Sequence, residues 1–168
     1  MIKDIVIKEA KTKAEYLAFV KFPYSLYKEN PNWVPPLIND EIETIDPDLN
    51  PVYQNANASF FLAYQDEKIV GRIAAIVNWI EVKEIKKSKV RFGWFDVIDN
   101  INVTKSLIDC VIKFGKDHNL ESVEGPLGFS NLDKAGLLIK GYEEQNTMIT
   151  LYNHPYYSEH LKKLGFNE

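Results

Sequence analysis

The sequence predicts one α/β domain built around a mixed β-sheet. Three observations lead to this fold class. β-branched and aromatic segments alternate with helical patterns, two adjacent apolar segments predict a hairpin, and a long amphipathic helix follows an aromatic-rich strand. The 168 residues fit a single domain, and neither a repeat nor a change in composition marks a boundary.

The first elements are a strand and a helix. Residues 4–10 (DIVIKEA) are rich in β-branched side chains and predict a strand. Residues 13–22 carry apolar side chains on one helical face, and Pro23 is expected to end or kink that helix, because proline lacks the backbone N–H.

The following segment predicts an irregular path. Residues 29–37 (ENPNWVPPL) contain three prolines, which favour extended backbone, and Trp33 is expected to pin this loop to the body of the protein. A short helix at 37–45 and a second loop at 46–57 are expected next, because apolar residues recur in the first and Asp, Asn and Pro dominate the second.

The middle of the chain predicts strands. Residues 59–65 and 69–78 read as a hairpin of two well-packed strands, and residues 91–99 form a further strand dense in aromatic side chains. Between them, residues 79–85 (WIEVKEI) fit either a continued strand or a loop.

The clearest helix is 104–119, where apolar residues repeat at helical spacing and either Asn102 or Thr104 serves as the cap. The lone cysteine, Cys110, lies in this helix and is expected to be a buried, inert thiol. The remaining elements expected are a short strand at 122–128, a helical turn or short helix at 133–140, a last strand at 146–153 and a final helix within 152–166.

The final helix has two interpretations. In the first it is a capped surface helix, which begins near Pro155 and buries one face. In the second it belongs to an active site, because Tyr156, Tyr157 and His160 lie within one turn and all can transfer protons.

Composition narrows the function classes. The chain is 45% hydrophobic and 26% charged, as is ordinary for a globular protein. A net charge of −4 gives no basic surface, so nucleic acid is not expected as a partner. No apolar segment reaches the length of a membrane span and the first residues are too polar for a signal peptide, so we expect a cytoplasmic protein with no membrane partner.

Familiar catalytic motifs are absent from the sequence. It has no phosphate-binding glycine loop, no nucleophile elbow and no HExxH pair. The histidines at 118, 154 and 160 have neither a second ligand at helical spacing nor a cysteine pair, so no metal site is expected. Motif chemistry alone leaves the activity open.

Four blocks of the sequence resemble the GNAT superfamily of acyl-CoA N-acyltransferases, and more narrowly an uncharacterised bacterial GNAT-like family. The blocks are residues 30–37 (NPNWVPPL), 69–78 (IVGRIAAIVN), 125–142 (GPLGFSNLDKAGLLIKGY) and 152–166 (YNHPYYSEHLKKLGF). Members of that family are usually longer, so residues 1–168 resemble their N-terminal part as a single GNAT-like domain.

The resemblance implies a mixed, splayed central sheet flanked by helices. The strands at 91–99 and 122–128 would run parallel and diverge at one end, and acetyl-CoA or another acyl-CoA would lie in the gap. A GNAT domain normally adds a strand after its last helix, but only two residues follow Phe166, so this final strand is expected to be missing. The edge of the strand at 146–153 would then be covered by a homodimer partner or by a missing C-terminal domain.

The resemblance also implies where acyl-CoA would bind. GNAT enzymes cradle the pyrophosphate with a glycine-rich turn, whereas residues 99–107 (DNINVTKSL) contain no glycine, and Asp96 and Asp99 bring negative charge. The N-terminus of the following helix still offers N–H groups and a favourable dipole. The implied cofactor-binding residues are Val97, Ile98, Asn102, Val103, Thr104 and Lys105.

The catalytic and acceptor residues follow from the same resemblance. Typical members carry a proton-donating tyrosine five residues before the Phe of the terminal Gly-Phe pair, and this chain has Leu161 there. The candidates for the acid are therefore Tyr156, Tyr157 and His160, and those for a general base are Glu124 and Asp96. The implied acceptor-binding residues are Trp33, Ser130, Asn131 and Asn153.

These inferences predict an N-acyltransferase that moves an acyl group from acyl-CoA to a small-molecule amine or a peptide. Two alternatives remain open at the sequence level. One is a binding or regulatory module that has lost the pyrophosphate cradle. The other is one half of a two-domain enzyme.

Overall fold

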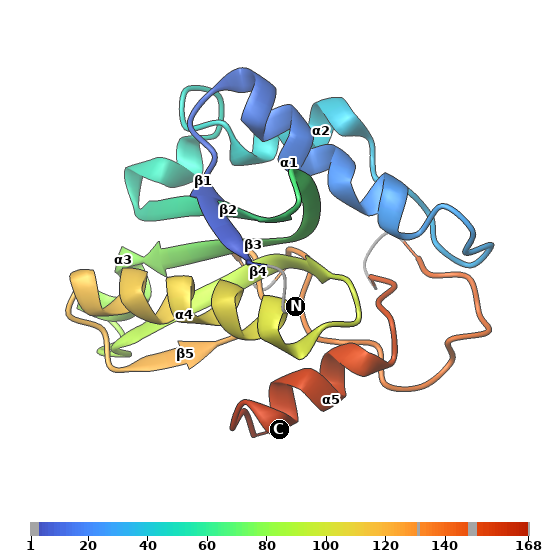
Figure 1. Cartoon of the computed structure of the whole chain (residues 1–168). Helices are drawn as coiled ribbons and strands as arrows, with labels where there is room; N and C mark the ends of the chain where they lie inside the picture. The colour runs from blue at the N-terminus through green and yellow to red at the C-terminus, as the bar shows by residue number, and fades with distance from the viewer. Residues whose placement is uncertain (1–3, 131, 148–150, 168) are drawn as a thin grey trace.

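The computed structural model describes residues 4–130, 132–147 and 151–167, and it places helices on both faces of one β-sheet (Figure 1). The elements, in chain order, are β1 Val6–Glu9, α1 Lys13–Leu26, α2 Ile38–Ile45, the 3₁₀ helix η1 Pro51–Gln54, β2 Ala56–Gln65, β3 Lys68–Asn78, α3 Trp79–Lys83, β4 Lys89–Val97, α4 Ile101–Asp117, β5 Ser122–Glu124 and α5 Tyr156–Lys163.

The sheet is mixed, as predicted, and in the described residues it has five strands, without the sixth that was expected at 146–153. Its order is β1-β2-β3-β4-β5, with antiparallel neighbours up to β4 and a parallel pair between β4 and β5. Asp66 and Glu67 join β2 to β3, and both have positive φ angles, 49° and 63°. This two-residue turn matches the right-handed twist of the flanking strands, so it supports the predicted hairpin.

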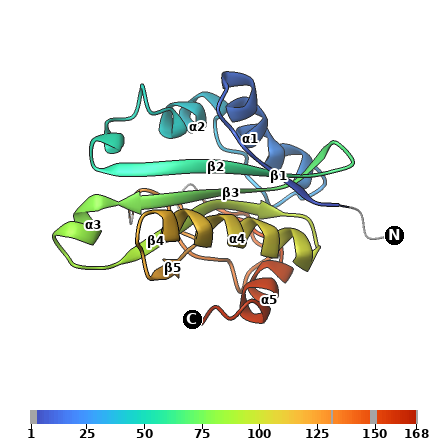
Figure 2. The same cartoon turned by 60° about the vertical axis from the view of Figure 1, so that its left-hand side comes forward.

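Helices cover the two faces of the sheet separately: α1 and α2 lie on one side and α4 on the other (Figure 2). The alternation of side chains along β3 explains this arrangement. Ile73 and Ala75 are buried in the core on the α4 side, whereas Ala74 and Ile76 are buried in the core on the α1 side. Two apolar layers therefore sandwich one sheet.

The strands β4 and β5 separate after a short parallel ladder. Their pairing starts at Lys89 opposite Ser122 and ends at Arg91 opposite Glu124. One further hydrogen bond follows, from Leu127 N to the carbonyl oxygen of Phe92 (2.7 Å), while β4 itself continues to Val97. The divergence of parallel neighbours that the resemblance implied is confirmed.

A β-bulge interrupts β4 just before the strands separate. The register with β3 shifts between the pairs Ala74–Gly93 and Arg72–Asp96, and Trp94 has a φ of +44°. A non-glycine residue rarely adopts this conformation in a strand, so the surrounding packing must hold it there. The bulge changes the direction of the β4 side chains that follow.

Helix α1 continues past Pro23 to Leu26, so of the two expected effects of the proline, an end to the helix is wrong. Proline cannot donate to the carbonyl oxygen of Phe19, four residues earlier. Arg72 Nη1 from β3 donates to that oxygen at 3.0 Å instead. A buried guanidinium therefore replaces the missing helical hydrogen bond.

Four other predicted elements differ in the structure, and local caps account for the first two. Residues 79–85 are neither strand nor plain loop, because Asn78 caps the short helix α3 through the N–H groups of Ile80 and Glu81. Helix α4 begins earlier than predicted, since its cap is Asn100, not Asn102 or Thr104. The strand expected at 122–128 ends at 124, and no helix forms at 133–140.

The strand predicted at 146–153 is not found in the described part of that segment, and residues 148–150 lie outside the described residues. Hydrogen bonds between side-chain amides and backbone groups of other segments fix these residues instead. Asn146 Oδ1 accepts from Val34 N (2.7 Å), and Asn153 Oδ1 accepts from Leu138 N (2.6 Å). The exposed strand edge that would need a partner is therefore absent from these described residues.

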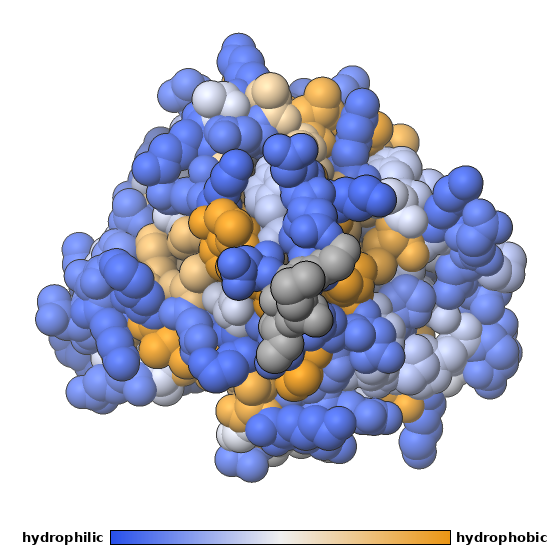
Figure 3. Space-filling view, viewed as in Figure 1, coloured by the Kyte–Doolittle hydropathy of each residue, from blue (hydrophilic) through white to orange (hydrophobic). Residues whose placement is uncertain are grey.

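The described residues include no helix long and apolar enough to cross a membrane. On the face drawn in Figure 3, hydrophilic residues cover most of the surface and apolar residues form separate patches between them.

Candidate active site

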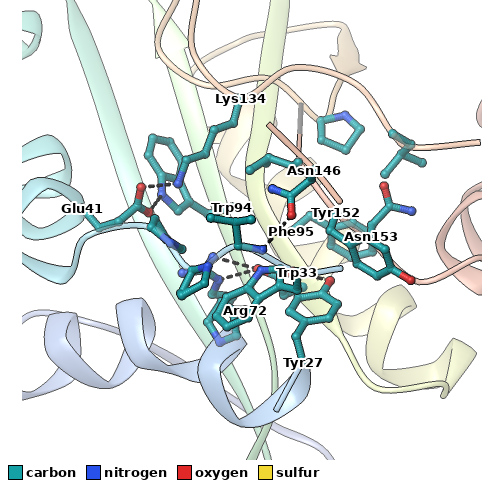
Figure 4. A pocket seen from close by; sticks show the side chains of 18 of the residues that line it. Tyr27, Trp33, Glu41, Arg72, Trp94, Phe95, Lys134, Asn146, Tyr152 and Asn153 are labelled. Atoms are coloured by element: carbon teal, nitrogen blue, oxygen red, sulfur yellow. Dashed lines mark hydrogen bonds and ion pairs between the residues drawn. The ribbon is translucent and has the colours of Figure 1, made fainter. Parts of the chain in front are cut away.

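A cavity of about 390 Å³ lies where β4 leaves β5, on the side of the sheet covered by α1 and α2 (Figure 4). The end of α1, the proline-rich loop, α2, the bulge of β4 and the segment after β5 all contribute to its wall. Lining residues include Tyr27, Trp33, Asp40, Glu41, Arg72, Trp94, Phe95, Asp96, Pro126, Lys134, Leu137, Tyr152 and Asn153.

A buried ion pair lies in the wall of this cavity. Arg72 Nε and Nη2 donate to Asp96 Oδ2 at 2.8 and 2.7 Å. The hydroxyl groups of Tyr27 and Tyr157 contact Asp96 Oδ1 at 2.8 and 3.3 Å. Both carboxylate oxygens are thus engaged, which argues against Asp96 as a general base.

Burial, together with the negative charge of Asp96, raises the pKa of Tyr27 and of Tyr157 well above the ordinary value. Both hydroxyls therefore stay protonated at neutral pH and act as hydrogen-bond donors. The second base candidate, Glu124, is exposed and pairs with Lys89 at the surface.

A second polar group in the wall joins α2, the β4 bulge and the segment after β5. Trp94 Nε1 donates to Glu41 Oε2 at 2.8 Å, and Lys134 Nζ forms an ion pair with Glu41 Oε1. Figure 4 shows Glu41 and Lys134 pointing toward one another. Burial lowers the pKa of the Lys134 ammonium group, although Glu41 opposes the shift. No motif in the sequence identified this group.

Helix α5 brings two predicted catalytic residues to the end of β4. The Tyr157 hydroxyl accepts from Val97 N (2.9 Å), and the Tyr156 hydroxyl donates to Val97 O (2.7 Å). Tyr157 is fully buried, whereas Tyr156 is partly exposed. Burial also raises the pKa of Tyr156, with smaller contributions from Asp99 and Asp96.

The third predicted catalytic residue, His160, links α5 to the start of α4. Its Nδ1 lies 2.8 Å from Thr104 Oγ1, and its Nε2 lies 3.2 Å from Asp99 Oδ1. Both His160 and Thr104 are buried, so neither side chain is open to solvent. Together with the tyrosine contacts, these bonds fix α5 against β4 and α4.

The predicted cofactor-binding residues fall into two groups. Val97, Val103 and Thr104 are buried, and Ile98 N donates to the carbonyl oxygen of Val70 (3.0 Å). Asn102 and Lys105 are exposed at the first turn of α4, where Lys105 pairs with Asp109. Of the six predicted residues, Asn102 and Lys105 are the two whose side chains are exposed at the N-terminus of α4.

Two predicted acceptor residues line the cavity. Trp33 stacks on Tyr27, with ring centroids 5.4 Å apart, and Asn153 is held by Leu138. Ser130 is exposed and makes turn hydrogen bonds, since its N–H donates to Asp133 Oδ2 and its Oγ accepts from Leu132 N. Asn131 lies outside the described residues.

His154 is a further residue that spacing did not single out. Its ring lies between those of Tyr27 and Tyr156, at centroid distances of 4.9 and 5.2 Å. Burial lowers its pKa, so the ring is neutral at neutral pH. Among the described residues no group of His, Cys, Asp or Glu has the arrangement of a metal site.

A second cavity, of about 280 Å³, lies between α5 and the segment after β5. Pro126, Gly136 and Leu137 line both cavities, so they form a common wall. The second cavity is mainly apolar, and its lining includes Leu161, at the position where the resemblance implied a tyrosine. The site therefore has two cavities, one partly polar and one mainly apolar, which share a wall.

No family model matches the chain. Protein YghO of Escherichia coli (strain K12) is 28% identical over 159 residues, which cover 93% of this chain and 40% of that protein. The bacterial ceramide synthase of Caulobacter vibrioides (strain NA1000 / CB15N) is 24% identical over 164 residues, covering 97% of this chain and 43% of that protein. The chain thus spans about two fifths of the length of each curated relative.

Solved acetyltransferase structures share the arrangement described above. A predicted acetyltransferase from Clostridium acetobutylicum, solved with acetyl-CoA, superposes with a TM-score of 0.58 at 10% identity, over 98% of this chain and 91% of that one. A tandem GNAT protein from the clavulanic acid biosynthesis pathway superposes with a TM-score of 0.54 at 11% identity, over 70% of this chain and 34% of that one. With the splayed β4–β5 pair, these likenesses show that the chain has the GNAT fold of the acetyltransferases.

Proposed function

We propose that this chain is an N-acyltransferase domain that moves an acyl group from an acyl-CoA to an amine. The observation that supports the proposal is that three structural features lie close together in the fold. The cavity opens on the bulged part of β4, β4 separates from β5 there, and α5 brings protonated tyrosine hydroxyls to Val97.

The reaction exchanges one acyl bond for another. The amine nitrogen attacks the carbonyl carbon of the thioester, a C–N bond forms and the C–S bond breaks. The amine attacks in its neutral form, so an acceptor bound as its ammonium first gives one proton to solvent. The attacking amine then loses a second proton and the departing thiolate gains one. A backbone N–H of β4 would stabilise the developing oxyanion, because such donors are most effective where water is excluded. The amine would occupy the cavity, and the acyl-CoA would occupy the gap between β4 and β5.

Tyr156 is the best placed of the three candidate acids. Its hydroxyl is protonated at neutral pH, because the ordinary pKa of tyrosine is 10.0 and burial raises it further, and the side chain is partly open to solvent. Tyr157 is fully buried and engaged with Asp96, Tyr27 and Val97. We therefore assign Tyr156 as the group that protonates the thiolate and Tyr157 as a residue that positions β4.

The acyl donor would use both the gap and the apolar cavity. The exposed first turn of α4, with Asn102 and Lys105, would face the phosphates of CoA. The apolar cavity beside Leu161 would hold the acyl chain, since its lining offers few polar partners. The name of the Caulobacter relative supports this substrate class, because a ceramide is the amide of a fatty acid with a long-chain amino alcohol.

One observation favours a second candidate function, a GNAT-fold module without catalysis. The chain's own tyrosines engage both backbone groups of Val97, and the loop before α4 has no glycine to cradle a pyrophosphate. In an enzyme, acyl-CoA must displace at least the Tyr157 contact to reach Val97 N. In a binding module that contact would be permanent.

The deciding experiment measures thiol release from acetyl-, octanoyl- and palmitoyl-CoA with octylamine as acceptor. The active protein should release thiol and form the amide. Tyr156→Phe should lower turnover by about 10²–10⁴-fold. Tyr53→Phe is the matched control, because Tyr53 also donates to a backbone carbonyl at 2.7 Å but lies outside the site. No thiol release with any of these donors, from a folded protein, would favour the non-catalytic module.

A further inference from the structure

We propose that Glu41 is the carboxylate that binds the protonated amine of the acceptor, and that Lys134 occupies its place in the free protein. The inference rests on the proposed function, because it specifies which ligand the cavity takes and which residue recognises it. It follows from the charges, the rigidity and the apolar surroundings of the described cavity wall.

The charges of the cavity single out Glu41. The acidic residues among those that line it are Asp40, Glu41 and Asp96. Asp96 is closed off by two contacts from Arg72 and by tyrosine hydroxyls, and Asp40 is exposed at the rim. Glu41 is only 6% exposed and directs its Oε1 at a single lysine. It is the buried carboxylate whose cationic partner can be exchanged.

The Glu41 carboxylate is held in position by rigid parts of the fold. It projects from α2, and its Oε2 accepts from the indole N–H of Trp94 at 2.8 Å. Trp94 is itself fixed by the bulge in β4, where its φ is +44°. A charged group that is already oriented loses little conformational freedom when it binds a ligand.

Lys134 comes from an irregular segment, whereas Glu41 comes from a helix. Lys134 lies in the segment between β5 and α5, whose described residues form neither helix nor strand. Burial disfavours its ammonium charge, as the lowered pKa indicates. Arg72, by contrast, binds both Asp96 and the Phe19 carbonyl. Replacing Lys134 by a ligand ammonium keeps Glu41 paired and lets Lys134 return to water.

The surroundings indicate the rest of the ligand. The cavity beside Glu41 has polar and apolar lining residues, and the apolar ones include Trp33, Pro35, Leu37 and Leu137. These side chains give hydrophobic contact but few hydrogen bonds. The acceptor class that fits is a primary amine on an apolar chain, with the ammonium group at Glu41 and the chain along these residues.

Calorimetry with octylamine and 1-octanol tests the inference on the 168-residue chain at neutral pH. The two probes share a chain and differ in charge. We expect the protein to bind octylamine roughly tenfold more tightly than octanol, as one charge-assisted pair gives. Glu41→Gln should remove this preference, and Lys134→Met should strengthen octylamine binding while octanol binding stays the same. Glu43→Gln is the matched control, because Glu43 lies on the same helix with an exposed side chain.

Three binding results would overturn the inference: no preference in the wild type, a preference that survives Glu41→Gln, or weaker octylamine binding in Lys134→Met. Glu41→Gln leaves Lys134 without its anion, so the double variant Glu41→Gln with Lys134→Met provides a neutral pair if the single variant unfolds. Amine binding that depends on Glu41 without any acyl transfer counts against the proposed function alone. Acyl transfer that Glu41→Gln leaves unchanged counts against this inference alone.

Discussion

At the scale of single residues, aromatic hydroxyls and imidazoles form the densest part of the site. His154 lies between Tyr27 and Tyr156, and Tyr157 contacts both Tyr27 and Asp96. Each member of this packed polar group has a partner, so the group favours one arrangement of its side chains. A change of charge on one member is costly, because the protein interior offers few alternative partners. Protonation of one ring should therefore be measurable in the stability of the whole domain.

The lowered pKa of His154 fixes the direction in which the stability of the domain changes with pH. Burial holds its folded-state pKa below the ordinary 6.5, so the unfolded chain binds more protons between these two values. Stability should fall as pH is lowered through about 6.5 toward the folded pKa, and should not depend on this residue above that range.

Thermal unfolding between about pH 7.5 and about pH 5.5 checks this expectation. His154→Phe keeps a ring between the two tyrosines but cannot titrate, so its melting temperature should fall less than that of the wild type. All other residues are the same in the two proteins, so their contributions cancel in the comparison. Parallel curves for the two proteins would contradict the prediction.

Arg72 is the residue whose removal should reduce stability most. Arg72→Met leaves the buried Asp96 carboxylate without its cation, with tyrosine hydroxyls as its other donors, and leaves the Phe19 carbonyl without the Arg72 donor. Breaking a buried ion pair from one side destabilises by about 3–5 kcal/mol. Urea unfolding measures the loss, and the double variant Arg72→Met with Asp96→Asn should recover part of it. A loss below about 1 kcal/mol for Arg72→Met would show that the pair is not structural.

At the scale of elements, the sequence predicted the helices and strands whose signals lie close together in the chain. The β2–β3 hairpin and α2 were predictable because periodicity and turn residues lie within a few positions of each other. The length of α1 was not, because the group that replaces the Pro23 hydrogen bond comes from Arg72, far along the chain. The described residues of 146–153 form no strand for a similar reason, since Asn146 and Asn153 bond to distant loops.

The first turn of α4 is the element on which acyl-CoA binding can be tested without disturbing the core. Asn102 is exposed there, whereas Thr104 is fully buried against His160. Asn102→Glu should weaken CoA binding about tenfold or more, because it places a carboxylate where the helix N-terminus would meet phosphate.

Isothermal calorimetry with CoA measures this change. Gln54→Glu is the control, because it adds the same charge at an exposed position in η1. If both variants bind CoA like the wild type, the phosphates do not lie at α4 and the donor site must be sought elsewhere.

At the scale of the whole molecule, the candidate site joins segments that no single motif contains. The residues of α5 were predictable as a group because Tyr156, Tyr157 and His160 lie one turn apart. Glu41 and Lys134 were not, because only the fold brings α2 next to the segment after β5. The common wall of the two cavities has the same origin, since it depends on the path of the chain after Gly125.

The two cavities lead to the last prediction, which concerns the length of the acyl chain. Ile139 lies at the apolar cavity beside α5 and is 59% exposed, so it can be changed without opening the core. Ile139→Asp should lower turnover with palmitoyl-CoA about tenfold and leave acetyl-CoA turnover unchanged. Only a long acyl chain would reach this position, where it would lose an apolar contact and remove water from the new carboxylate. Leu132→Asp is the matched control, since Leu132 is 93% exposed and lines neither cavity. Equal losses with both donors, or no loss with either, would mean that the acyl chain does not occupy this cavity.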